Sequence, residues 1–131
     1  MNLQAIWLWF AAAMLAGPCL TIPTMRLVND IPTGGWGSYN AARELVTVER
    51  GHGDWVAIHE FAHHYWHVCN VDERPVGRFF LRVTGHESWT RQAREEWAAT
   101  LTFVLTGQPR WMWDVRLDAA HTMRRIILFD G

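Results

Sequence analysis

Five consecutive residues, His59-Glu60-Phe61-Ala62-His63, carry two imidazoles and a carboxylate at a spacing that suits a metal ion. On a helix, residues four apart lie on one face, so His59 and His63 can offer two nitrogen ligands to the same ion. Glu60 lies beside this pair and can take a proton from a water that the metal activates. The pattern therefore predicts a zinc-dependent hydrolase with Glu60 as its general base.

A catalytic zinc needs a third protein ligand beside its open position, and two later segments could supply it. Cys69 could act as a thiolate, but the chain would have to bend away from the helix to deliver it. Glu95 and Glu96 are carboxylate candidates, and helical periodicity places Glu96 closer to the apolar stripe of its segment. The alternative is an exposed face on which these carboxylates pair with Arg91 or Arg94.

The residues around both segments resemble those of zincin metallopeptidases. Residues 56–65 match their extended active-site pattern, with valine three before the first histidine and a hydrophobic residue two after the second. Residues 95–98 resemble the E-x-aromatic-Ala signature on the second helix of gluzincin-type peptidases. The resemblance implies one catalytic Zn²⁺ held by His59, His63 and Glu95, with hydrolysis of a peptide or protein substrate.

Other residues near the motif fit the metal site less well. Trp66 and Cys69 stand where the metzincin branch has glycine and histidine, which disfavours that branch. His59 and His67 lie about 12 Å apart on a straight helix and cannot share an ion, so His67 and His64 are expected at the rim or in support of the ligands.

Peptide hydrolysis also needs a donor that stabilises the alkoxide oxygen of the transition state. Tyr39, His86 and His121 are the available residues outside the motif helix, and none of them belongs to a motif. The identity of this donor therefore stays open.

Hydrophobic periodicity and breaker residues predict the elements that position these groups. Helices are expected over 54–68, 90–106 and 113–128, strands over 20–28 and 45–49, a loop over 30–37, and a short strand or hairpin over 76–83. Asp54 is the expected N-cap of the motif helix, and Pro23 should delay the first strand or place it at an edge. The strand over 45–49 resembles the zincin strand that borders the cleft, where it would pair with an extended peptide or simply finish a small sheet.

The first 25 residues carry no charge, and most of them are apolar. The favoured interpretation is a first core helix that ends at Gly17-Pro18, and the alternative is a signal peptide or membrane anchor. The compartment depends on that choice. Cys19 and Cys69 could form a disulfide or remain two buried thiols, and their spacing favours neither.

The length of 131 residues predicts one domain over 1–131, and half of the residues are hydrophobic, including nine tryptophans. A net charge of −1 offers no electrostatic basis for binding nucleic acid. The prediction is an α+β fold, a minimal zincin-like metallopeptidase with a small sheet on its active-site helix. The alternatives are a zinc-binding regulatory domain that cleaves nothing or one specific partner, and a small membrane-anchored protein with a fortuitous histidine cluster.

Overall fold

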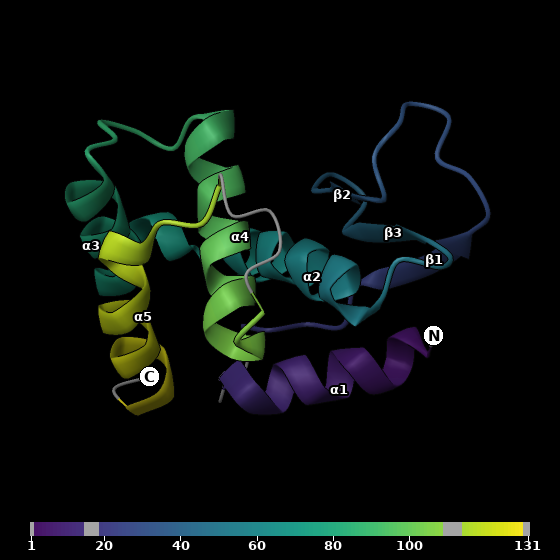
Figure 1. The fold of residues 1–131 in the computed structure, drawn as a ribbon, viewed down its shortest axis with the longest axis horizontal. Coiled ribbons are helices and arrows are strands. Elements are labelled where there is room, and N and C mark those ends of the chain that lie inside the picture. The colour runs from purple at the N-terminus through teal and green to yellow at the C-terminus, as the bar shows by residue number, and fades with distance from the viewer. Residues whose placement is uncertain (1, 15–18, 109–113, 130–131) are drawn as a thin grey trace.

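The computed structural model describes residues 2–14, 19–108 and 114–129, which form five α-helices, a short 3₁₀ helix and three β-strands (Figure 1). In chain order these are α1 (Leu3–Met14), β1 (Thr24–Val28), β2 (Gly37–Asn40), β3 (Leu45–Glu49), α2 (Asp54–Val68), η1 (Val71–Glu73), α3 (Pro75–Thr84), α4 (Arg91–Thr106) and α5 (Leu117–Phe129). The α+β class predicted from the sequence is therefore confirmed.

The sheet has the strand order β1-β3-β2, so β3 lies in the centre and β2 forms one edge. β3 pairs in parallel with β1 and in antiparallel with β2, and Val46 and Val48 of β3 are fully buried. The sequence prediction that β3 could pair with a peptide is wrong, because both of its edges are already occupied. β1 begins at Thr24, directly after Pro23, and lies at the other edge as expected.

Helix α2 runs through the middle of the molecule and spans the predicted residues (Figure 1). It contacts the sheet through β2 and β3, and it also contacts α1 and α4. Phe61 is fully buried, with its ring centroid 5.2 Å from that of Trp7 and 5.8 Å from that of Phe10 in α1. The N-cap residue is Gly53 with φ 89°, and the predicted cap Asp54 is the first helical residue.

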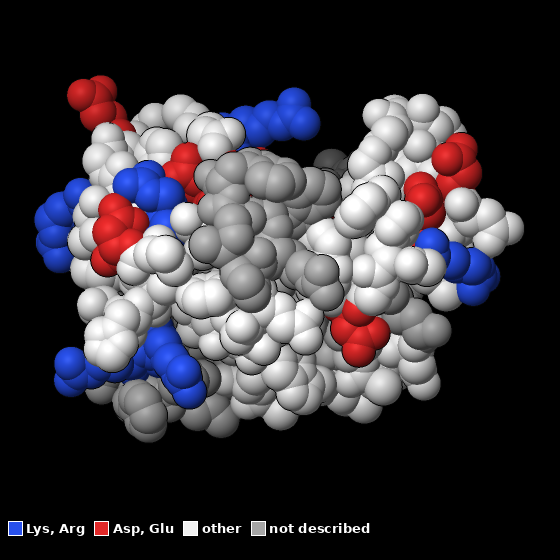
Figure 2. All heavy atoms as spheres, viewed as in Figure 1, with Lys and Arg blue, Asp and Glu red and all other residues white. Residues whose placement is uncertain are grey.

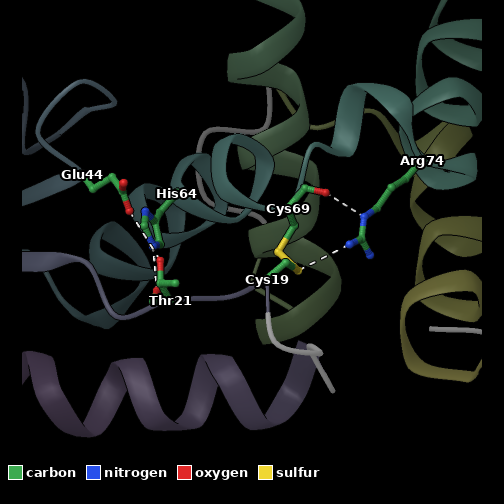
Figure 3. Close-up of a disulfide and its surroundings, with 6 residues drawn as sticks. All are labelled: Cys19, Thr21, Glu44, His64, Cys69 and Arg74. Atoms are coloured by element: carbon green, nitrogen blue, oxygen red, sulfur yellow. Dashed lines mark hydrogen bonds between the residues drawn. A yellow bond between two sulfur atoms is a disulfide. The ribbon is translucent and has the colours of Figure 1, made fainter.

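Helix α1 packs its inner face, which consists of Ile6, Trp7, Phe10 and Met14, into the core. The end predicted for this helix at Gly17-Pro18 falls outside the described residues. No helix in the described ranges is long and apolar enough to cross a membrane. Cys19 forms a disulfide with Cys69, which ties the segment after α1 to the C-terminal end of α2 (Figure 3).

The prediction of a strand or hairpin over 76–83 is wrong, because these residues belong to α3. Val76, Phe79, Phe80 and Val83 recur at helical spacing, and Pro75 starts the helix while Gly85, with φ 78°, ends it. Gly77 permits close packing, since a Cβ there would lie 1.8 Å from the carbonyl oxygen of Val71.

Helix α4 matches its prediction and is capped by Thr90, whose hydroxyl accepts a hydrogen bond from the backbone N–H of Ala93 at 3.1 Å. Helix α5 begins at Leu117, whereas its predicted start at 113 lies outside the described residues. Figure 1 shows α4 crossing one end of α2, with α3 and α5 on the far side of α4 from the sheet.

Candidate metal centre

Two packed helices bring the candidate ligands together. Helix α2 carries His59, Glu60 and His63, and α4 carries Glu95. The helices contact each other through buried residues, including the rings of Tyr65 and Trp97, which stack with centroids 6.4 Å apart. The side chains that could do chemistry therefore rest on two rigid elements.

The carboxylate of Glu95 lies between the two motif histidines. Nε2 of His59 is 3.2 Å from Oε2 of Glu95, and Nε2 of His63 is 3.1 Å from Oε1. One ligand atom from each residue can be chosen so that all three lie within 4.8 Å of one another. In the described part of the chain, no other group of His, Cys, Asp or Glu meets this condition.

The donor set fits zinc, because two imidazoles, one carboxylate and an open position make up a common catalytic zinc site. Zn–N and Zn–O bonds of about 2.0–2.1 Å place neighbouring ligand atoms of a tetrahedron roughly 3.3 Å apart. The separations of 3.2 and 3.1 Å at Glu95 are close to this value, although they end on different carboxylate oxygens, and they are equally those of hydrogen bonds from imidazole to carboxylate. Nδ1 of His59 is buried and has no hydrogen-bond partner within the described residues, so packing and the contact between Nε2 and Glu95 orient this ring.

Glu96, the alternative ligand, points elsewhere. Its carboxylate accepts hydrogen bonds from His86 at 3.0 Å, Arg116 at 2.9 Å and Gln92 at 2.9 Å. Within the described residues neither Glu95 nor Glu96 pairs with Arg91 or Arg94, so the ion pairs of the exposed-face alternative are not formed.

Glu60 lies under the first residue of β2. A Cβ added to Gly37 would lie 2.9 Å from Oε2 of Glu60 and 2.9 Å from Cγ1 of Val56. Only a glycine lets the strand approach the carboxylate this closely. Sequence reasoning missed Gly37 because it was assigned to a loop, and its role appears only once β2 is placed against α2.

Charge and burial shift the acid–base properties of the cluster. Hydrogen bonds from His59 and His63 hold the pKa of Glu95 well below its ordinary value. Burial lowers the pKa of His59, but its hydrogen bond to Glu95 and the charges of Glu60 and Glu95 outweigh this and raise the pKa. Burial also raises the pKa of Glu60, while His59 and His63 act in the opposite direction. A carboxyl group with a raised pKa is suited to accept and return a proton.

Cys69 is excluded as a ligand by its disulfide with Cys19. His64 is not at the rim but fully buried, and its Nε2 donates to the carbonyl oxygen of Thr21 at 2.8 Å (Figure 3). Its Nδ1 is then an acceptor, and Tyr39 donates its hydroxyl proton to it at 2.8 Å. His64 therefore fixes β2 to the motif helix.

None of the three oxyanion candidates is aimed at the cluster. Tyr39 gives its hydroxyl proton to His64, and His86 contacts Glu96. His121 is exposed on α5. The donor that this step needs is therefore not identified among the described residues.

Two cavities meet at Glu60 and Glu95, and both are also lined by Gly37. The smaller, of about 250 Å³, extends past Trp36, Trp55 and Asp114. The larger, of about 830 Å³, extends along β2 and past His63 and His67. An extended ligand could thus cross the cluster and occupy space on both sides.

Searches of protein-family models, of curated proteins and of solved structures find no match to this chain. The functional conclusion must therefore come from the geometry of the site itself.

Proposed function

We propose that this protein is a zinc-dependent peptidase in which His59, His63 and Glu95 hold the ion. The observation that carries the proposal is the position of the Glu95 carboxylate, 3.2 and 3.1 Å from the Nε2 atoms of the two histidines. The second segment was predicted as the source of the third ligand for the histidine motif, and the two lie more than 30 residues apart in the chain. Their convergence at the meeting point of two cavities supports a metal site open to substrate.

A zinc ion bound there would lower the pKa of water and polarise a substrate carbonyl. Glu60 takes the proton of the attacking water and passes it to the leaving amine. Its burial and the close approach of Gly37 restrict the positions that its carboxylate can adopt. Proton transfer therefore takes place in a confined space next to the scissile bond.

The edge strand β2 is the element suited to hold the substrate backbone. It pairs with β3 on one side only, and Gly37, Ser38 and Tyr39 line the larger cavity. An extended peptide could add to this edge by backbone hydrogen bonds and cross the cluster. Pairing with an extended peptide, which the sequence suggested for β3, is therefore assigned to β2.

The assignment to a minimal zincin-like domain is part of the same proposal. It depends on the two motifs at residues 56–65 and 95–98, because an α+β class with a three-stranded sheet is common to many families.

The test measures metal and cleavage in one preparation. Protein purified gently should contain about one equivalent of zinc by mass spectrometry, and it should cleave members of a peptide library. Chelator should abolish cleavage and added zinc should restore it. Less than about half an equivalent of zinc would favour a fortuitous histidine cluster, whereas one equivalent without any cleavage would favour a regulatory zinc domain.

A further inference from the structure

The two cavities beside the cluster differ in charge. Apart from Gly37, Glu60 and Glu95, which they share, the smaller cavity offers aromatic rings and Asp114. The larger cavity is lined by two arginines, Arg91 and Arg94, beside His63 and His67. A substrate that crosses the cluster therefore meets arginine side chains on one side only.

The Arg94 guanidinium is held in place before any substrate binds. One of its nitrogens, Nη1, donates to the carbonyl oxygen of Trp89 at 3.2 Å, and its central carbon lies 5.7 Å from the ring centre of Trp66. A guanidinium has five N–H donors, so most of them stay available to a ligand. Stacking on an aromatic face also orients the planar group and reduces the entropy lost on binding.

The charge of these two arginines is not compensated by an ion pair within the described part of the chain. Among the residues that the structure describes, neither Arg91 nor Arg94 forms an ion pair, because Glu95 is taken by the histidines and Glu96 by Arg116. Figure 2 shows blue, basic atoms at the edge of a hollow in the upper part of this face. The larger cavity is therefore prepared for an anionic group.

The spacing places that group close to the scissile bond. Trp66, which supports Arg94, follows His63 by three residues, or about 4.5 Å along α2. An extended peptide advances about 3.3 Å per residue. Arg94 also directly precedes Glu95 on α4 and both line the larger cavity, so a carboxylate held by Arg94 belongs to a residue within a few positions of the cleaved bond.

We propose that the larger cavity selects substrates carrying a carboxylate, which Arg94 binds and Arg91 attracts. The inference rests on the proposed peptidase function and adds a substrate class to it. The carboxylate could be an Asp or Glu side chain within a peptide, or the free C-terminus of a short one. In the first case the protein is an endopeptidase with acidic preference, and in the second it trims C-terminal residues.

Two sets of peptides separate these sources. The first set has amidated C-termini and moves a single Glu, with Gln as control, through three positions on each side of the cleaved bond. The second set has no acidic side chain and ends in either a free or an amidated C-terminus at the same positions. On one side of the bond, either the Glu side chain or the free C-terminus should raise kcat/KM by at least about tenfold over its uncharged control, Gln or the amide.

The variant Arg94→Gln should reduce that preference to less than about threefold, because it removes the charge and the forked donors. Arg78→Gln is the matched control, since Arg78 is exposed on α3 and lines none of the cavities at the cluster. It makes the same change in net charge and should keep the preference of the parent protein.

A binding measurement gives a readout that does not depend on hydrolysis. Fluorescence anisotropy with labelled peptides and chelator-treated protein should show tighter binding of the carboxylate peptide, and Arg94→Gln should remove the difference. Zinc-dependent cleavage without a preference for either carboxylate would overturn the inference and leave the peptidase proposal intact. Carboxylate-selective binding without any cleavage would overturn the peptidase proposal and support selection by Arg94, while the absence of both would overturn the two together.

Discussion

Glu95 and Glu96 are neighbours on α4, yet they belong to two histidine–glutamate clusters of opposite character. The Glu96 carboxylate is buried, accepts three hydrogen bonds and is neutralised by Arg116, which also binds Asp118. The Glu95 side chain is 39% exposed, meets only the two imidazoles and borders both cavities. The first cluster joins α4 to α5 and to the end of α3, whereas the second lies where the two cavities meet.

This contrast separates a carboxylate that supports the fold from one that the proposed zinc site would use. A buried carboxylate stabilises a fold when its charge is compensated and its lone pairs are satisfied. A metal ligand must instead keep an accessible lone pair directed at a shared point. A rotation of about 100° between consecutive helical residues is enough to place one glutamate in each environment.

The largest expected effect is on zinc affinity. Structural zinc sites bind with about 10–16 kcal/mol from four ligands, so loss of one ligand should weaken binding roughly a hundredfold to a thousandfold. Glu95→Ala should show this loss in competition with a chromophoric chelator, and Glu96→Ala should stay within about threefold of the parent. If the two variants exchanged these results, the ligand would be Glu96 and the comparison would be reversed.

The second effect separates chemistry from metal binding at the Glu95 cluster. Glu60→Gln removes the base and leaves both imidazoles, so hydrolysis should fall at least about a hundredfold while zinc stays near one equivalent. Peptide cleavage and metal content are measured on the same sample. Full activity in this variant would show that Glu60 is not the base, whatever the metal content.

The third effect is on stability, and here the loss of Glu96 should matter more than the loss of Glu95. In metal-free protein, Glu96→Ala should lower the free energy of unfolding by about 2–3 kcal/mol, because it leaves His86 and Arg116 without their shared acceptor. Glu95→Ala should cost less than about 1 kcal/mol, since the side chain it removes is partly exposed. Urea denaturation measures both, and equal losses would remove the distinction between the clusters.

The sequence predicted the parts of the fold whose signals are local. α2, α4 and β3 have clear periodicity and breakers at their ends, and all three lie where expected. β2 was missed because Gly37–Asn40 has no β-branched residue and becomes a strand only by pairing with β3. α3 was mistaken for a strand because a short apolar run fits both periods, and the helical spacing of its apolar residues was overlooked.

The candidate site was predictable to a similar extent. The motif at 59–63 and the carboxylates at 95 and 96 were both found from residue types and spacing. Periodicity did not decide which carboxylate faces the histidines. The choice depends on Arg116, which comes later in the chain and neutralises Glu96. Gly37 was also beyond reach, since its importance comes from a contact between β2 and α2.

The smallest expected effect tests the confinement of Glu60. In Gly37→Ala, the new methyl group would lie 2.9 Å from Oε2 of Glu60 and from Cγ1 of Val56, so the carboxylate must move aside. We expect kcat to fall about tenfold with zinc retained, because displacement of the base by a few tenths of an ångström weakens proton transfer without touching the ligands. The matched control is Gly77→Ala, whose methyl group would collide with the Val71 carbonyl, at residues that line neither cavity at the cluster. Gly77→Ala should lower the melting temperature more than Gly37→Ala does, yet keep the parent's turnover per bound zinc. If both glycine variants lost turnover in proportion to their loss of stability, Gly37 would be a packing residue with no specific relation to Glu60.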